Sequence, residues 1–369
     1  IQNNSLINKW LIYRTSLMKK ALLMITLVLG CTTVFAQKID KKEAAQIKSF
    51  LSQPAEKDGT NAQALKVTDM NSIASIEGVT VENGHVTAID WKDKHIAGNL
   101  DLSGFSQLKS VNVSRNKIAG LNISNTPVLS EVNASRNALR TFEVNGASAV
   151  QKLSINNNRL TDLTLNGMSN LKNLNCANNH FVELNAANSP VLETLNCQGN
   201  RIESLMVTGC AQLKNLYAGY NKLTSLNLFG TENLANLNID DNDITTMVVS
   251  GLPALNTFVC SDNNMVTLGV RNCPNLIDLV CSYNDLTTLD VNGCTNLTFV
   301  DCSYNDLTQL TLSNQNFLQR LLCNNNQLTM LDVSFDQALT YINMRYNQIS
   351  DFRSVGCTNL RMIASQWNW

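Results

Sequence analysis

Cysteine is the residue type in this chain best suited to chemistry, because a thiol can form a disulfide, bind a metal or act as a nucleophile. The chain has 369 residues and eleven cysteines. Ten remain if Cys31 is lost with a leader peptide, and an even count in an exported protein invites a disulfide interpretation. The ten fall into two sets whose members are separated by 21 residues or a multiple of 21: Cys176, Cys197, Cys260, Cys281, Cys302 and Cys323, and then Cys210, Cys273, Cys294 and Cys357.

This shared period assigns the cysteines to repeat positions rather than to a reactive site. Other repeats have Val113, Ala134 or Ile155 at the position of the first set, so these thiols replace small hydrophobic side chains of a core. Neighbours such as Cys273 and Cys294 could come within disulfide reach, but side chains stacked in register fit a torsion of about 90° poorly. The sequence has no CxxC motif and no cluster of histidines near the cysteines, which argues against a metal site.

The sequence also lacks the residue patterns of catalysis. The three histidines lie far apart in repeat number: His85, His95 and His180. They cannot be assembled with a serine or cysteine into a nucleophilic site, and no glycine-rich phosphate loop is present. Asp240, Asp241 and Asp262 gather in the middle repeats, but carboxylates on an exposed face favour a solvated surface over an acid–base pair. We therefore predict that the chain is not an enzyme and holds no cofactor or metal.

Asparagine sets the period of the repeat. It recurs thirteen times at intervals of 21 residues: Asn116, Asn137, Asn158, Asn179, Asn200, Asn221, Asn242, Asn263, Asn284, Asn305, Asn326, Asn347 and Asn368. Each side-chain amide can hydrogen-bond backbone groups of neighbouring turns that would otherwise be buried without a partner. We call these residues the asparagine ladder.

Hydrophobic residues keep the same phase, so that one unit reads LxxLxCxxNxLxxLxVxGCxN, as in Leu276–Asn296. This is the leucine-rich-repeat pattern. Alternate residues of the short LxC segment point inward, and segments of successive units stack in parallel about 4.8 Å apart. The pattern predicts a repeat solenoid, a right-handed superhelix with a concave parallel β-sheet, in which each coil is stabilised by its neighbours.

The N-terminus predicts export. Residues 18–36 contain two lysines, an apolar run that is too short to span a bilayer, and Val34-Phe35-Ala36, which fits a cleavage site before Gln37. A lipoprotein acylated at Cys31 is the alternative. We interpret residues 1–17 as an upstream extension. Without the first 36 residues the chain has 24 basic and 29 acidic residues, and no basic stripe that would indicate a nucleic-acid partner.

The two ends of the array differ from the repeat. We expect residues 37–94 to form an N-terminal cap and an irregular first coil, with one extra residue near Asn99. In this cap, Asp40–Glu43 resembles a capping box, Ala44, Ile47 and Leu51 share a helical face, and residues 78–91 predict a hairpin. The array is expected over 95–369. It stops one residue after Asn368 without a polar cap, which predicts a C-terminal truncation.

The unit with cysteine in its strand, Leu279–Val291, resembles the cysteine-ladder repeats of the J-type internalins. These are bacterial surface leucine-rich-repeat proteins implicated in adhesion. Residues 78–91 similarly look like the cap of many extracellular leucine-rich repeats. The resemblance implies a secreted or cell-surface binding module. The chain departs from surface internalins in having no wall-sorting motif and no immunoglobulin-like domain.

The outward positions of the sheet predict where a ligand binds. Residues six, four and two positions before each ladder asparagine should project into solvent, and the residue one position before it should lie at the rim. These positions are polar in early repeats and become aromatic or aliphatic later, which is typical of an interaction surface. The predicted ligand-binding residues are Tyr217, Tyr220, Val259, Val280, Tyr283, Phe299, Tyr304, Leu322, Tyr341 and Tyr346. A host or neighbouring-cell protein is the expected partner; a glycan-binding module and a non-binding structural spacer are the alternatives.

Overall fold

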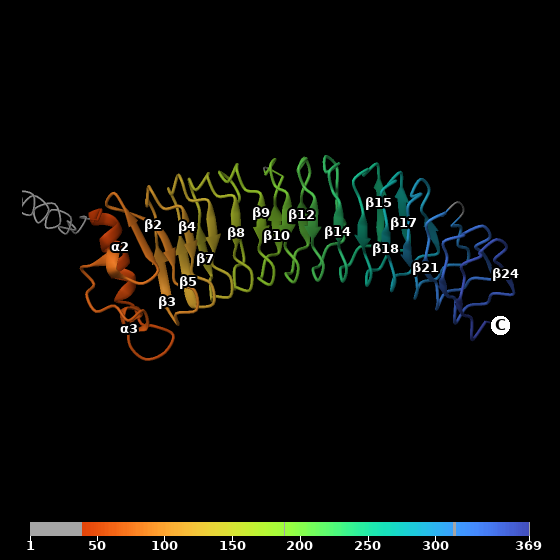
Figure 1. Ribbon diagram of the computed structural model, residues 1–369, viewed down its shortest axis with the longest axis horizontal. Helices are drawn as coiled ribbons and strands as arrows, with labels where there is room; N and C mark the ends of the chain where they lie inside the picture. Colours follow the sequence, from red (N-terminus) through yellow and green to blue (C-terminus); the bar gives the residue numbers. More distant parts are fainter. Residues whose placement is uncertain (1–38, 188, 313–314, 369) are drawn as a thin grey trace, which may run out of the picture.

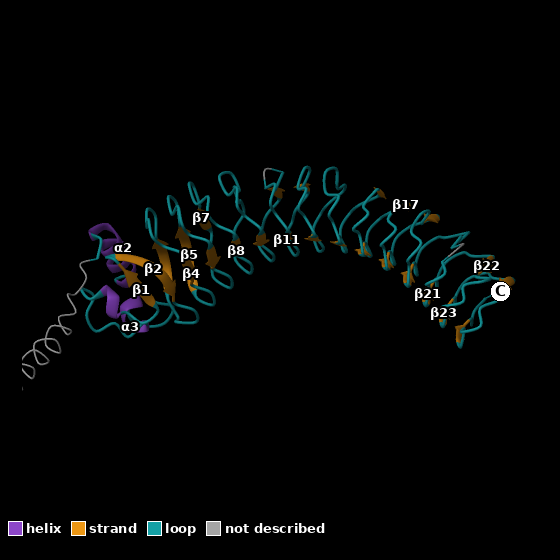
Figure 2. Cartoon of the chain, turned by 45° about the horizontal axis from the view of Figure 1, so that its top comes forward, coloured by secondary structure: helices purple, strands orange, loops and turns teal. Residues whose placement is uncertain are grey.

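The computed structural model describes residues 39–187, 189–312 and 315–368. The predicted signal peptide at 18–36, the alternative acylation site Cys31 and the extension at 1–17 all lie outside these residues. The described chain winds into a long arc of coils, shown in Figures 1 and 2. Within these residues no helix is long and apolar enough to cross a membrane.

One sheet runs along the whole array on the inner side of the arc (Figure 2). Its strands are parallel from β2 onward, and most neighbours pair with an offset of one 21-residue repeat, as Leu279 pairs with Phe258 and Val300. In order they are β1 (Val79–Glu82), β2 (His85–Asp90), β4 (Ser110–Asn112), β6 (Glu131–Asn133), β8 (Lys152–Ser154), β9 (Asn173–Asn175), β11 (Thr194–Asn196), β13 (Asn215–Tyr217), β14 (Asn236–Asn238), β16 (Thr257–Val259), β18 (Asp278–Val280), β20 (Phe299–Asp301), β21 (Arg320–Leu322), β23 (Tyr341–Asn343) and β25 (Met362–Ala364). We call the inner side of this sheet the concave face.

In most coils the returning half contributes a strand to short parallel sheets towards the outer side of the arc (Figure 2). The strands of these four sheets are β3 (Ala97–Asp101), β5 (Lys117–Asn122) and β7 (Thr141–Glu143); β10 (Glu183–Asn185) and β12 (Ser204–Met206); β15 (Thr246–Ser250), β17 (Thr267–Arg271) and β19 (Thr288–Asp290); and β22 (Met330–Asp332) and β24 (Asp351–Arg353). The predicted parallel solenoid is therefore confirmed.

The asparagine ladder runs through the array beneath the concave sheet. Asn263 is typical: its Nδ2 donates to the carbonyl oxygens of Ile239 at 3.0 Å, Cys260 at 3.3 Å and Ser261 at 3.1 Å. Its Oδ1 accepts from the backbone N–H of Ile244 at 3.0 Å. Each such side chain therefore joins its own coil to the coil before it. The same pattern recurs in coil after coil, and most of the ladder side chains are buried.

The core is a continuous column of apolar side chains, one layer from each coil. The central residue of most three-residue strands points into it, as Leu279 does in β18. All ten cysteines of the described chain carry free thiols; nine are buried and Cys357 is half-buried. Burial raises the pKa of Cys197 and of Cys323 to about 12, so both thiols stay protonated. The prediction that the cysteines belong to the core is confirmed.

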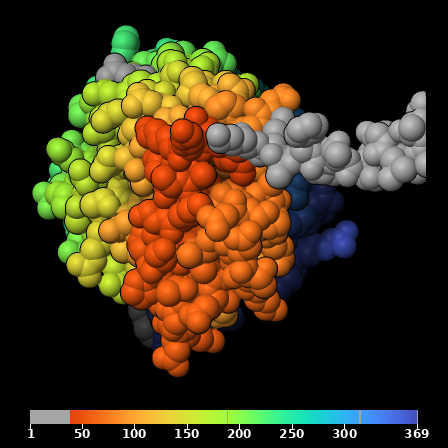
Figure 3. Space-filling view, turned by 90° about the vertical axis from the view of Figure 1, so that its left-hand side faces the viewer, coloured from red at the N-terminus to blue at the C-terminus, as the bar shows by residue number. Residues whose placement is uncertain are grey.

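The N-terminal cap covers the first coils with two α-helices, α2 (Lys41–Leu51) and α3 (Asn61–Ala64), a 3₁₀ turn, η1 (Ile73–Ser75), and the β1–β2 hairpin. Figure 3 shows these segments lying over the end of the solenoid. The helix and the hairpin were predicted, whereas α3 and η1 lie in a stretch whose sequence gave no clear pattern. As the extra residue near Asn99 predicted, the pairing of β3 with β5 shifts register between Gly98 and Asn99.

The predicted capping box of α2 is only half formed. The Asp40 carboxylate accepts from the backbone N–H groups of Lys42 and Glu43, as expected. The Glu43 side chain, however, does not accept a hydrogen bond from the Asp40 N–H. Its buried carboxylate lies 3.0 Å from His85 Nδ1 and accepts from the Val86 N–H at 2.8 Å. The physical reason is that the Asp40 N–H already donates to Gly84 O, so Glu43 is left to anchor the hairpin.

Candidate binding surface

The predicted apolar residues of the later coils lie on the concave face. In every strand of the concave sheet from β13 to β23 the central residue is buried and the two flanking residues point outward. Tyr217, Val259, Val280 and Leu322 end their strands, whereas Phe299 and Tyr341 begin theirs. All six are half-buried rather than fully exposed, because side chains on strands about 4.8 Å apart cover part of one another.

One expectation for this face is wrong. Residues two positions before the ladder asparagine do not generally project into solvent. Ser114, Ser261, Ser282 and Ser303 are buried, and the Ser261 and Ser282 hydroxyls lie 3.0 Å apart. The strand has already ended there and the chain turns inward towards the ladder, so a small side chain fits beneath the rim.

Four tyrosines form an exposed row along one rim of the concave face. Their side chains are 57%, 51%, 42% and 50% exposed, in the order Tyr220, Tyr283, Tyr304 and Tyr346. The rings of Tyr283 and Tyr304 are stacked with centroids 4.3 Å apart and planes 8° from parallel. The Tyr346 ring stacks in the same way on the Trp367 ring, with the ring centroids 6.0 Å apart. We call these four residues the rim tyrosines.

The rim tyrosines occupy a backbone conformation that tyrosine disfavours. Their φ angles lie between 53° and 56°, in the left-handed region. For a residue with a Cβ this conformation costs roughly 1–2 kcal/mol of conformational free energy, whereas glycine and asparagine adopt it more easily. In other coils the same column has Asn157, Asn178, Gly199 and Asn325, and also Asp241, Asp262, Arg115, Arg136 and Trp367, all in the left-handed region. The repeat thus imposes this conformation in every coil, and asparagine or glycine would adopt it at a lower cost than tyrosine.

Five aspartates lie on the concave face and at its rim, among these aromatic residues: Asp240, Asp241, Asp262, Asp278 and Asp301. We call them the face aspartates. None of them has a basic partner within 4.0 Å in the described chain, whereas lysines in earlier coils are paired, as Lys152 is with Glu131 at 2.6 Å. Asp240, Asp241 and Asp262 were predicted to be solvated surface residues, whereas Asp278 and Asp301 were not among the predicted site residues.

The face aspartates act together on their surroundings. The Asp240 carboxylate raises the pKa of the Tyr220 hydroxyl above its ordinary value, with further contributions from partial burial, Asp241 and Asp262. Burial raises the pKa of Asp240 itself, and the Asp241 charge adds to that effect. Residues 223–319 contain ten acidic residues and a single basic one, Arg271, which pairs with Asp290 at 2.6 Å. The middle of the array is therefore strongly anionic, although the whole chain is nearly neutral.

One arginine already binds to aromatic rings on this face. The Arg320 guanidinium lies 5.3 Å from the ring centroid of Phe299 and 5.8 Å from that of Tyr341. Both distances fall within the range of about 6 Å in which a cation is attracted to an aromatic face. Phe299 and Tyr341 are thus partly covered by the chain itself.

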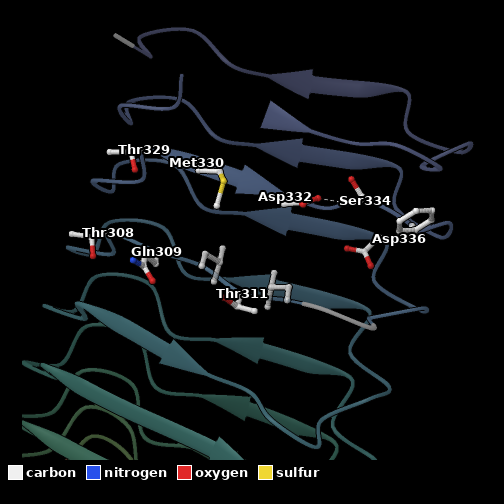
Figure 4. Close-up of a pocket in the computed structure, with 11 residues that line it drawn as sticks. Thr308, Gln309, Thr311, Thr329, Met330, Asp332, Ser334 and Asp336 are labelled. Atoms are coloured by element: carbon white, nitrogen blue, oxygen red, sulfur yellow. Dashed lines mark hydrogen bonds between the residues drawn. The ribbon is translucent and has the colours of Figure 1, made fainter. Parts of the chain in front are cut away.

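A separate pocket of about 450 Å³ lies on the returning side of the coils, around β22. Figure 4 shows Asp336, Thr311 and Met330 among its lining residues, with Asp332 accepting from the backbone of Ser334. Burial raises the pKa of Asp336 to about 7, and the nearby Asp332 charge adds to this shift. Phe335, beside Asp336, is largely exposed, as is Phe229 in an earlier coil. The sequence analysis singled out none of these residues.

The remaining reactive residue types are not assembled into a catalytic or metal site within the described residues. His85 pairs with Glu43 and His95 with Glu56, both in the N-terminal cap, while His180 lies several coils away. No group of three or more histidine, cysteine, aspartate or glutamate side chains is placed to hold a metal ion in that part of the chain. A hydrogen bond from Cys294 lowers the pKa of the Cys273 thiol to about 7.

Comparison with known proteins places this geometry among established folds. No protein-family model and no curated protein matches the chain. Several solved structures, however, match its fold. YopM, a leucine-rich effector protein from Yersinia pestis, is 24% identical over 72% of this chain and 76% of its own length, with a TM-score of 0.59. The internalin InlF from Listeria monocytogenes is 16% identical over 86% of this chain and 94% of its own, with a TM-score of 0.54.

The fold is that of the leucine-rich repeats. The likeness to internalins that the repeat predicted is confirmed at the level of the fold. The functional domain of InlJ from Listeria monocytogenes, which includes a cysteine ladder, also matches, at 25% identity and a TM-score of 0.48. The alignment covers 71% of this chain and 54% of that domain. Leucine-rich-repeat proteins of this kind commonly bind other proteins, and the fold itself does not specify which.

Proposed function

We propose that this chain is an exported, secreted or cell-surface module that binds a protein ligand on the concave face of its later coils, between Tyr217 and Tyr346. The observation that carries the proposal is the row of rim tyrosines. Exposed aromatic residues in a conformation that favours asparagine or glycine reduce the stability of the fold, and contact with a ligand would account for their presence. The leader-like sequence at 18–36 supports export, and adhesion is the role that fits such a module.

The half-buried residues of the concave face extend the proposed surface. Val259 and Val280 follow one another on paired strands, as do Tyr341 and Arg320 further along. Together with the rim tyrosines they offer a mixed aromatic and aliphatic strip, the composition that is enriched at the centre of protein–protein interfaces. We assign binding rather than catalysis to this strip, because its residues offer contact area without a nucleophile and base in reach of each other.

The test compares two matched double variants after a partner has been found by screening the chain on protein and glycan arrays. In Tyr283→Asn/Tyr304→Asn we expect a loss of affinity of at least about tenfold per tyrosine, since buried interface tyrosines are typical hot spots. In Phe229→Asn/Phe335→Asn, which removes two exposed rings from the returning side, affinity should stay unchanged. The free energy of unfolding of the tyrosine variant should change by no more than about 1 kcal/mol, because relief of the left-handed strain offsets the lost ring stacking.

Two outcomes would contradict the proposal. If the tyrosine variant binds the partner as well as the wild type, the concave rim is not the binding surface. If the only ligands found on the arrays are neutral glycans, the module binds sugars rather than proteins.

A further inference from the structure

The surface of the middle coils has an unbalanced negative charge next to exposed aromatic rings. On strands β14, β16, β18 and β20 and in the turns that follow them, no lysine or arginine is present, whereas all five face aspartates are. The nearest basic residues already have partners: Arg271 pairs with Asp290 at 2.6 Å on the returning side, Lys222 lies 3.7 Å from Asp243, and Arg320 covers Phe299 and Tyr341. The charge on this part of the concave face is therefore not neutralised within the chain.

Resting on the proposed function of the concave face, we propose that the ligand presents a cationic segment, rich in arginine, that lies along the coils from Asp240 to Tyr304. Its guanidinium groups stack on Tyr283 and Tyr304 and pair with the face aspartates. The strip spans three intervals between coils of about 4.8 Å, or roughly 15 Å, which corresponds to about five residues of an extended peptide.

The stacking part of this recognition has a counterpart within the chain. Arg320 shows that a guanidinium fits over the rings of this face at 5.3 and 5.8 Å. Tyr283 and Tyr304 offer a larger and more exposed platform of the same kind, with Asp262, Asp278 and Asp301 on the strands and turns beside it. Arginine suits such a site better than lysine, because its planar group stacks on aromatic rings and pairs with carboxylates through two parallel hydrogen bonds.

Charge complementarity separates this ligand from the alternatives. Phosphate-bearing and acidic partners would be repelled by five unpaired carboxylates. A neutral glycan could stack on the tyrosines but would leave the carboxylate charges uncompensated. A cationic peptide gains from both features and would be steered towards the face as it approaches.

The test titrates fluorescein-labelled hexa-arginine, hexa-lysine and hexa-glutamate peptides against the chain and follows fluorescence anisotropy at low and at physiological salt. We expect hexa-arginine to bind several-fold more tightly than hexa-lysine, with affinity that falls as salt rises, and hexa-glutamate not to bind. Neutralising four face aspartates with Asp240→Asn, Asp262→Asn, Asp278→Asn and Asp301→Asn should weaken hexa-arginine binding at least tenfold.

The array itself supplies reasons why this variant should fold. Asparagine occurs in the same four columns in other coils, at Asn156, Asn178, Asn236 and Asn238. Asn112 accepts from the Ser114 backbone and hydroxyl in the same way as Asp301 accepts from Ser303. An unchanged melting temperature would show that the loss of binding is local.

A charge-matched control distinguishes a site from diffuse attraction. Glu143→Gln, Glu183→Gln, Glu203→Gln and Glu232→Gln remove the same number of charges from exposed positions outside the concave sheet. If this control weakens hexa-arginine binding as much as the aspartate variant does, or if hexa-arginine does not bind, the cationic-ligand proposal is wrong. The proposed function would still stand if the partner from the array screen binds the aspartate variant normally and loses affinity for Tyr283→Asn/Tyr304→Asn.

Discussion

Replacing Asn263 by alanine should lower the free energy of unfolding by about 2–4 kcal/mol, far more than the loss of one polar side chain would suggest. The substitution removes three donated hydrogen bonds and leaves the buried N–H of Ile244 without its acceptor. The three carbonyl groups each retain a second donor, such as Asn242 for Ile239 O and Asn284 for Cys260 O, so the unpaired N–H carries most of the cost.

The neighbouring residue provides the control. Asn264 is adjacent in the chain, exposed, and its side chain has no hydrogen bond within the described residues. Asn264→Ala should change stability by less than about 0.5 kcal/mol. Urea unfolding measures both variants, and amide hydrogen exchange at Ile244 shows whether the damage is local to this coil. Equal stability of the two variants would mean that the asparagine ladder does not stabilise the array.

The second large effect concerns Asp336 and should appear as a dependence on pH. In several other coils the same column has a hydrogen-bond donor: the Thr126 and Thr231 hydroxyls donate to backbone carbonyl groups at 2.7 Å, and the Cys357 thiol does so at 2.9 Å. An ionised carboxylate cannot donate a hydrogen bond. In this column the protonated form of Asp336 is therefore favoured. Burial and the nearby Asp332 charge raise the pKa of Asp336 to about 7 in the folded protein.

The direction of the effect follows from linkage. Between the ordinary value of 3.8 and about 7, the folded state holds a proton on Asp336 that the unfolded state has released. The contribution of protonated Asp336 to the free energy of unfolding is therefore complete below about pH 4 and is lost as pH rises to about 7. A shift of this size corresponds to at most about 4 kcal/mol in the coils around β22.

Asp336→Thr should remove this dependence. At pH 8 we expect the variant to be more stable than the wild type by about 2–4 kcal/mol, and at pH 4 the two should be nearly equal. Thermal unfolding followed by circular dichroism from pH 4 to pH 8 measures the difference. A difference that stays constant over this range would show that Asp336 does not titrate there.

The coil itself could be predicted from sequence because the period of 21 residues fixes the position of every repeated side chain. The ladder, the inward cysteines and the hairpin cap follow from that period and from short-range patterns. The prediction of a full capping box was wrong because Glu43 contacts His85 and Val86 instead of the Asp40 N–H. These are long-range contacts that depend on where the hairpin lies. The buried serines at the rim were missed because period alone does not reveal where a three-residue strand ends.

The strain of the rim tyrosines was missed, although the sequence contained a signal for it. The column before the ladder asparagine has Asn157, Asn178, Gly199 and Asn325, residue types that tolerate the left-handed region. These residues mark the column as left-handed, so the conformational cost of tyrosine there could have been predicted, as could that of Arg115, Arg136 and Trp367 in the same column. The face aspartates could also have been predicted, because Asp278 and Asp301 stand six and four positions before a ladder asparagine, in columns that the period assigns to the concave face.

A footprint of the aromatic side chains in the free and the bound protein tests the central claim most directly. The chain is exposed to hydroxyl radicals with and without the partner from the array screen, and oxidised residues are mapped by mass spectrometry. Binding on the concave face predicts that Tyr220, Tyr283 and Tyr304 become protected in the complex while Phe229 and Phe335 are oxidised as before. Protection of Phe229 and Phe335 with unchanged oxidation of the tyrosines would place the ligand on the returning side and contradict the account.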